Sequence, residues 1–194
     1  MPITYTNHKG FTYTLCRGTT KTGKPRYYFS REPKDEPVEQ IPEGYAISES
    51  VNGIVSLSKE RPSQIRAEEV EAVNAVLARH PLKRKYRVGL KPDRIDIYEL
   101  VGPDSQDISA MMKEIGFPGV YSAEHLRASI DDYARFTPIM RFTLIDAEHR
   151  TFGAERMCYR GSIDDFIDID SGPISVLAKR LIPKLGTEQF FELF

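Results

Sequence analysis

Cysteine, tryptophan and long apolar runs are what this sequence has least of. Its 194 residues include two cysteines, Cys16 and Cys158, and no tryptophan. Two cysteines outside any C-x-x-C pair do not build a disulfide framework, a zinc site or a dithiol redox centre. No apolar run approaches the roughly 20 residues that span a bilayer. Residues 1–8 lack the charged and apolar regions of a signal peptide. We therefore expect a cytoplasmic protein with no membrane partner.

The overall composition is that of a folded protein, with 40% hydrophobic and 28% charged residues and a net charge of -1. The charge is unevenly divided along the chain. Residues 1–100 carry 17 Lys and Arg against 13 Asp and Glu, whereas residues 101–194 carry 10 against 15. A polyanionic partner would therefore meet the first half of the chain.

One segment comes close to a phosphate-binding loop. Gly18, Gly23 and Lys24 fit the pattern G-x-x-x-x-G-K, but Pro25 stands where a Ser or Thr hydroxyl would hold magnesium. Such a loop also needs a helix after it, so that backbone N–H groups face the phosphates. Residues 26–30 are instead an aromatic run with strand preference. We therefore predict a hairpin turn here, with no nucleotide at residues 18–24 and no cofactor.

Alternating apolar residues and turn signals predict a small antiparallel β unit over residues 1–60. Residues 3–6, 11–16 and 26–30 read as a three-stranded meander. The pair Asn52 and Gly53 is a strong hairpin signal, because both central positions of a type I′ turn need positive φ. It joins strands predicted at 45–48 and 54–57. The charged, proline-containing segment 31–40 is expected to be an exposed connection.

Residues 61–194 read as an α+β body. A helical stripe of valine and leucine over 70–77 is followed by hairpins predicted within 86–101 and 139–159. Helices are expected over 107–115, with Met111 in the core, and over 122–133, with Tyr133 inward. A last helix begins near Pro173, and its buried stripe includes Leu177 and Leu181. The predicted class is α+β: N-terminal antiparallel hairpins, then a mixed antiparallel sheet with about four helices.

Two basic segments are candidates for contact with nucleic acid. Cations that bind phosphates stand beside flat rings that stack on bases, the two ingredients of single-strand binding. The candidate residues are Lys21, Lys24, Arg26 and Tyr28 in the first segment, and Lys83, Arg84, Lys85 and Arg87 in the second. In the alternative interpretation of the first segment, a solvated turn lies beside a core face formed by Tyr27 and Phe29. In the alternative interpretation of the second segment, the basic residues pair with acidic neighbours.

An acidic segment is the candidate for a metal site, because magnesium and calcium prefer carboxylate oxygens. Its carboxylates are Asp164, Asp165, Asp168 and Asp170. Their spacing does not match an EF-hand. In the alternative interpretation these residues are the polar edge of the core, and Asp170 or Ser171 caps the last helix. No catalytic residue is identified elsewhere in the sequence.

The C-terminal segment 188–194 holds four large apolar residues in seven positions. Two interpretations fit this pattern. The segment either docks on the protein's own core or serves as a peptide that binds another protein.

The N-terminal part resembles an uncharacterised bacterial protein family. The resemblance covers roughly the first 60 residues, in which TKTGKPRYYFS is followed by IPEGY and then by Asn52 and Gly53. The family pattern reads T-K-T-G-K-P-[RK]-Y-F-F-S and I-P-E-G-Y-E-I. The chain departs from it at Tyr28, at Ala46 and at Val51. The resemblance implies a bacterial protein of unknown role and supplies no activity or site residue.

The sequence thus favours a non-catalytic binding protein with an anionic partner, nucleic acid. A metal-assisted hydrolase or nuclease using the acidic segment is the first alternative. A protein-protein adaptor using the C-terminal segment is the second.

Overall fold

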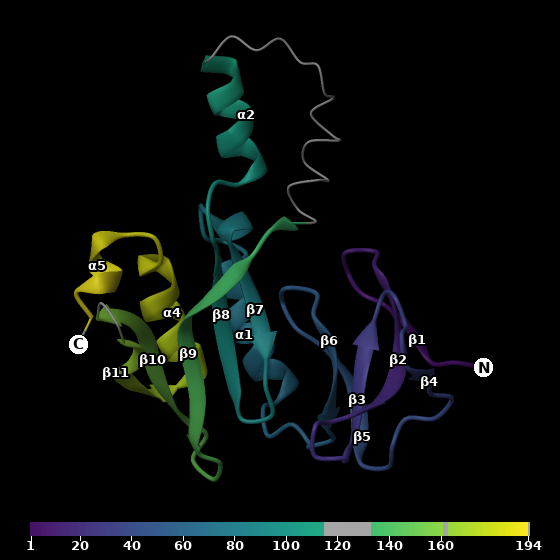
Figure 1. Ribbon diagram of the computed structural model, residues 1–194. Coiled ribbons are helices and arrows are strands. Elements are labelled where there is room, and N and C mark those ends of the chain that lie inside the picture. Colours follow the sequence, from purple (N-terminus) through teal and green to yellow (C-terminus); the bar gives the residue numbers. More distant parts are fainter. Residues whose placement is uncertain (115–132, 161–162, 194) are drawn as a thin grey trace. The chain divides into compact units, whose positions relative to one another are not determined.

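The structure, a computed structural model, describes residues 1–114, 133–160 and 163–193. Contacts divide the chain into two compact units, Met1–Arg61 and Pro62–Phe194. Both units are built on antiparallel sheets, and helices occur in the second (Figure 1). The fold is therefore α+β, as the sequence predicts. Among the described helices, none is long and apolar enough to cross a membrane.

The unit Met1–Arg61 is a set of hairpins. Strand β2 (Thr12–Thr19) lies between β1 (Thr4–Thr6) and β3 (Pro25–Ser30), and β5 (Tyr45–Glu49) pairs with β6 (Val55–Lys59). The meander and the second hairpin predicted from the sequence are confirmed. The predicted type I′ turn of that hairpin is wrong, because Gly53 has positive φ but Asn52 does not, and the turn closes from Gly53 N to Ser50 O at 2.8 Å. Residues 31–40 are exposed for the most part, but they also contain a short strand, β4 (Glu36–Pro37), that pairs with Cys16 and Arg17 of β2. The segment is therefore more than a connection.

Polar contacts join the two hairpins of this unit. The Asn7 side chain, 4% exposed, donates a hydrogen bond to the Gly53 carbonyl at 2.7 Å. Gly53 has φ +76°, and a Cβ there would lie 2.9 Å from Asn7 Nδ2. Both the turn and this close approach therefore require glycine. The Tyr5 hydroxyl also donates to Glu49 at 2.9 Å.

The unit Pro62–Phe194 is built on a five-stranded antiparallel sheet in which each strand pairs with its neighbour along the chain. The strands are β7 (Tyr86–Leu90), β8 (Arg94–Leu100), β9 (Phe136–Asp146), β10 (Thr151–Arg160) and β11 (Ile163–Pro173). Helix α1 (Ala67–Leu77) lies behind β7 and β8 in Figure 1. The described part of the unit also contains helices α2 (Ser105–Glu114), α4 (Ile174–Leu181) and α5 (Glu188–Phe191) and the short 3₁₀ turns η1 (Lys83–Lys85) and η2 (Ile182–Lys184).

Apolar side chains of the sheet and of α1 and α4 form one core. Ile95, Met140 and Phe142 of the sheet are fully buried with Val73 of α1 and Leu177 of α4. The helical stripes predicted for these helices are confirmed. The C-terminal segment also joins this core, because Phe190 of α5 is only 3% exposed. Docking on its own core is therefore the correct interpretation of that segment.

Two expectations for this unit are wrong. Met111 is 56% exposed and Tyr133 is 78% exposed, so neither is a core residue; the rest of the helix predicted over 122–133 lies outside the described residues. Helical periodicity alone does not reveal whether a helix has a core to pack against.

Candidate nucleic-acid interface

The register of the β2–β3 hairpin fixes which side chains share a face. Cys16 pairs with Tyr28, and Gly18 pairs with Arg26. Directly paired residues of antiparallel strands point to the same side of the sheet, so Arg26 and Tyr28 share one face. Tyr27 and Phe29 point to the other side. Arg26 and Tyr28 of the predicted site therefore lie together, whereas the rings of Tyr27 and Phe29 lie on the opposite face.

Tyr28 is held by two neighbours. The Arg26 guanidinium carbon lies 5.8 Å from the centre of the Tyr28 ring, within cation–π range. The Tyr28 hydroxyl donates a hydrogen bond of 2.6 Å to Asp35 Oδ2. The pKa of Tyr28 is raised to about 12, mainly by this hydrogen bond and to a smaller extent by burial and by the charge of Asp35. The ring therefore stays neutral and fixed at one edge at physiological pH.

Gly18 makes the contact between Tyr28 and Asp35 possible. A Cβ at position 18 would lie 2.5 Å from Asp35 Oδ2 and 3.3 Å from Tyr28 Cε1. Such distances are shorter than van der Waals contact, so a side chain here would displace the carboxylate. The contact between Tyr28 and Asp35 therefore explains why the first position of the phosphate-loop pattern is a glycine.

We expect Gly18→Ala to return the pKa of Tyr28 from about 12 toward its ordinary value of 10.0. The added methyl group pushes Asp35 away, and the hydrogen bond that stabilises the protonated phenol is lost. The measurement is a pH titration of the Tyr28 ring carbon by NMR, with Asp35→Asn as the comparison that removes the carboxylate charge directly. A pKa of Tyr28 that stays about 12 in Gly18→Ala would contradict the role given to the glycine.

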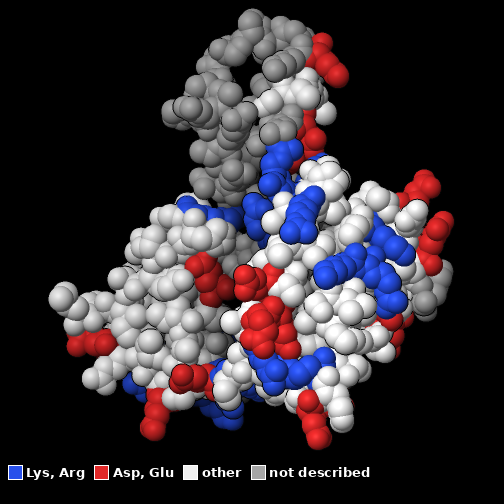
Figure 2. Space-filling view, turned by 180° about the vertical axis from the view of Figure 1, so that it is seen from behind, with Lys and Arg blue, Asp and Glu red and all other residues white. Residues whose placement is uncertain are grey.

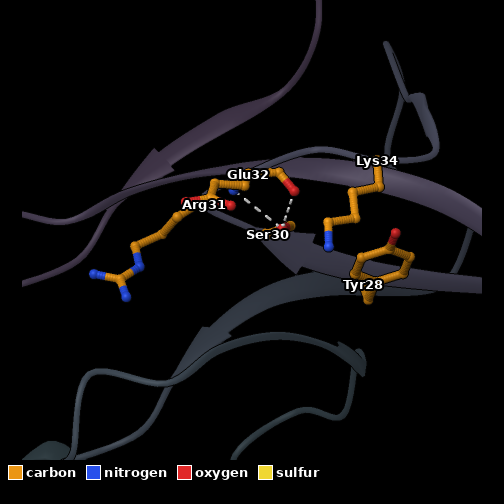
Figure 3. Close-up of a pocket in the computed structure, with 5 residues that line it drawn as sticks. All are labelled: Tyr28, Ser30, Arg31, Glu32 and Lys34. Carbon is orange, nitrogen blue, oxygen red and sulfur yellow. Dashed lines mark hydrogen bonds between the residues drawn. The ribbon is translucent and has the colours of Figure 1, made fainter.

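A surface pocket of about 450 Å³ opens beside Tyr28 (Figure 3). Its lining is Tyr28, Ser30, Arg31, Glu32 and Lys34. In Figure 3 the Lys34 amine extends toward Ser30, next to the Tyr28 ring, whereas Arg31 points away from them. The Arg31 guanidinium instead lies 4.9 Å from the centre of the Phe11 ring. The pocket thus offers an aromatic ring and an ammonium group side by side.

The turn between β2 and β3 carries the remaining cations of this site. Thr20 N donates to Lys24 O at 2.8 Å, and Gly23 N donates to Thr20 O at 2.9 Å. Gly23 has φ +78°, so the turn takes a left-handed residue. The predicted hairpin is therefore confirmed. Within the described parts of the chain, neither Lys21 nor Lys24 forms an ion pair.

The second basic segment, residues 83–87, is largely occupied by contacts within its own unit. Lys85 Nζ lies 2.8 Å from Asp107, and Arg84 lies 3.5 Å from Asp104. Arg87 donates to the carbonyls of Arg84 and Tyr86, and it lies 5.0 Å from the centre of the Phe136 ring. The hydrogen bond to Asp107 raises the pKa of Lys85 and keeps it charged.

Arg84 and Lys85 are therefore paired with acidic neighbours, whereas Lys83 is exposed and has no ion pair among the described residues. On the face drawn in Figure 2, Lys and Arg form several small groups rather than one large patch. A phosphate that approached Arg84 or Lys85 would have to compete with a carboxylate already in place. The hairpin is thus the stronger of the two candidate surfaces.

The acidic segment 164–170 lies within strand β11. Adjacent residues of a strand face opposite sides, so Asp164 and Asp165 do not converge. Asp168 pairs with Glu155 across the sheet, and Asp170 forms an ion pair with Arg180 of α4. No group of three His, Cys, Asp or Glu residues suited to a metal ion occurs among the described residues.

The prediction that Asp170 or Ser171 caps the last helix is wrong. The residue before α4 is Pro173, not Asp170 or Ser171. The strand was missed because its apolar and acidic residues do not alternate cleanly. A β-bulge between Ala154 and Glu155 of the partner strand also shifts the register.

Sequence reasoning also missed a charged network on the sheet. Asp96, 2% exposed, lies 3.2 Å from Arg94 and 3.4 Å from Arg141. The Arg141 guanidinium stacks 3.5 Å from the centre of the Phe166 ring. The alternation of Arg94, Asp96 and Tyr98 with apolar residues was visible, but cross-strand pairing cannot be read from one strand alone.

No protein-family model matches this chain, and neither a curated protein nor a solved structure matches it. The function is therefore inferred from the geometry and chemistry of the site itself.

Proposed function

We propose that the protein is a non-catalytic binding protein that contacts single-stranded nucleic acid through the Tyr28 face of the β2–β3 hairpin. The observation that carries this proposal is that Tyr28 and Arg26 lie on the same face of the hairpin, beside the Lys34 amine. Bases stack on exposed rings, and phosphates are bound by nearby cations. Lys21 and Lys24 extend the positive charge along the turn.

Single strands fit this surface better than duplexes. A duplex keeps its bases stacked inside, so an isolated ring at a pocket finds no base face to contact. The surface also lacks a helix or a long ribbon that would enter the major groove. Sequence specificity is expected to be low, because every base offers a flat face to a ring.

The test is fluorescence anisotropy of labelled single-stranded and duplex oligonucleotides, titrated with the full chain at two salt concentrations. The double variant Lys21→Gln/Lys24→Gln should weaken single-strand binding. It should also reduce the slope of log affinity against log salt by roughly 1.4, at about 0.7 for each phosphate that is no longer neutralised. The matched control is Lys59→Gln/Lys91→Gln, which removes the same charge from exposed lysines outside the site. Equal weakening in both double variants, or no binding at low salt, would overturn the proposal.

The ring itself is tested by a second pair of variants. Tyr28→Ala removes the stacking surface and should weaken single-strand binding by about tenfold. Tyr28→Phe keeps the ring and removes only the hydroxyl that contacts Asp35, so its affinity should stay within about threefold of the wild type. If Tyr28→Phe were as weak as Tyr28→Ala, the Asp35 contact rather than stacking would be responsible.

A further inference from the structure

A second concave site lies in the unit Pro62–Phe194, independent of the proposed nucleic-acid surface. It is a groove of about 310 Å³ where the end of α1 meets α4 and η2. Its lining is Val76, Arg79, His80, Pro81, Lys179 and Pro183. The volume falls at the lower end of the range that small-molecule pockets occupy. A ligand there would be small.

His80 lines this groove, and one hydrogen bond shows which of its ring nitrogens carries the proton. Its side chain is 6% exposed, and the backbone N–H of Leu82 donates to His80 Nδ1 at 3.1 Å. In the neutral ring an accepting Nδ1 carries no proton, so the proton is on Nε2. The edge-to-face contact with Tyr86, at 5.2 Å between ring centres, holds the ring in this orientation. The Nε2–H group is therefore a fixed hydrogen-bond donor.

The charged residues of the groove are all cationic. Arg79 and Lys179 line it, and no Asp or Glu does. Neither of these two cations has an ion pair within the described ranges. The remaining lining side chains, from Val76, Pro81 and Pro183, are apolar. Charge complementarity thus selects a ligand with a negative group on an apolar body.

Basic residues at the end of a helix also stabilise the helix dipole, which is the simplest explanation of Arg79. Free carbonyls at such an end would repel an anion. Here, however, the carbonyls of Val76 and Leu77 accept hydrogen bonds from Arg79 N at 3.1 Å and His80 N at 3.0 Å. With these carbonyls satisfied, the side chains determine the sign of charge that the groove prefers.

We propose that this groove binds a small monocarboxylate with an apolar body. The carboxylate accepts hydrogen bonds from His80 Nε2 and from the Arg79 and Lys179 side chains. The apolar body lies against Val76 and the two prolines. The two oxygens of a carboxylate match the planar fork of the arginine guanidinium.

The probe is hexanoate, titrated into the full chain by isothermal calorimetry and followed by two-dimensional NMR of backbone amides. Hexanamide, which has the same body without the charge, is the matched ligand. Hexanoate is expected to bind about tenfold more tightly and to shift the amide signals of residues 76–80, 82 and 179–182. Equal affinities for the two compounds, or no saturable binding of hexanoate at millimolar concentrations, would overturn the proposal.

Two sets of variants separate charge from the hydrogen bond. Arg79→Gln/Lys179→Gln should weaken hexanoate binding by about tenfold and leave hexanamide unchanged. Lys91→Gln, at an exposed turn outside the groove, is the charge control. His80→Asn keeps an acceptor for Leu82 N–H but has no donor at the position of Nε2, whereas His80→Gln places an amide donor near that position.

Hexanoate should therefore bind more weakly to His80→Asn than to His80→Gln. Unchanged affinity in the Arg79→Gln/Lys179→Gln variant would overturn the assignment of the groove. Backbone amide spectra report whether each variant is folded before its affinity is compared. None of these residues belongs to the β2–β3 hairpin, so the outcome is independent of the nucleic-acid titrations.

Discussion

Replacing Glu69 with alanine is expected to lower the free energy of unfolding of the unit Pro62–Phe194 by about 3–5 kcal/mol. Glu69 of α1 is 6% exposed and accepts a hydrogen bond from Arg150 Nε at 2.8 Å. Its other oxygen accepts from the Arg150 guanidinium and, at 2.8 Å, from the backbone N–H of Arg66. The variant leaves a half-buried guanidinium and a helix-end N–H group without the carboxylate that both contact.

The matched control is Glu71→Ala, an exposed glutamate on the same helix with the same helix-propensity change. The measurement is urea unfolding, followed by circular dichroism, which reports the helices of this unit. A destabilisation in Glu69→Ala no larger than that in Glu71→Ala would show that the ion pair contributes nothing beyond an ordinary surface contact.

The same ion pair gives the stability a defined pH dependence. Burial alone would raise the pKa of Glu69, but the hydrogen bonds from Arg150 and from Arg66 N–H lower it overall. Because the folded pKa is below the unfolded one, the contribution is complete above the unfolded value of about 4.5 and is lost as the pH falls through the folded value. Glu69→Gln cannot titrate, so its unfolding free energy should fall less steeply below that pH.

Replacing Phe190 with alanine should cost about 3–5 kcal/mol, the usual cost for a phenylalanine removed from a core. Phe190 is 3% exposed and belongs to the same core as the sheet. The neighbouring Phe191→Ala is the matched control, because Phe191 is 56% exposed and loses little buried area. Thermal and urea unfolding of the two variants compare one residue type at adjacent positions.

Hydrogen exchange gives the second readout of this prediction. Arg156, 4% exposed on β10, donates from Nε to the Leu193 carbonyl and from its NH2 group to the Phe191 carbonyl, both at 2.8 Å. These bonds tie the C-terminal segment to the sheet. In Phe190→Ala we expect amides of residues 188–193 to lose protection before those of β9 and β10 do. Comparable destabilisation by both phenylalanine variants would mean that the segment is not docked as described.

Local signals in the sequence predicted hairpins and helical stripes well. Asn52 and Gly53 correctly marked the position of a hairpin, although only Gly53 takes the positive φ expected of both. Leu177 and Leu181 share a helical face whatever surrounds them. Met111 was misassigned because periodicity says nothing about the presence of a neighbouring surface. The strand β11 was missed because its Asp residues are stabilised by partners distant in the chain, such as Arg180, which the local sequence does not reveal.

The candidate site was predicted in part. Lys24, Arg26 and Tyr28 are neighbours in the chain, so alternation along a strand was enough to place Arg26 and Tyr28 on one face. The contact of Tyr28 with Asp35 depends on the path of the chain after β3, and no periodic signal encodes that path. The groove at His80 joins helix ends about 100 residues apart in sequence, a juxtaposition that only the tertiary fold creates.

The order of the five-stranded sheet bears on how this unit reaches its native state. Every strand pairs with the next one along the chain, so the sheet can grow by adding one hairpin at a time. At most steps the entropic cost of closing the loop is therefore small. Helix α1 precedes the sheet, but its buried Glu69 must wait for Arg150, 81 residues later, before its charge is matched. Although the ribosome makes α1 before the sheet, this helix is therefore expected to be among the last elements to acquire its native contacts.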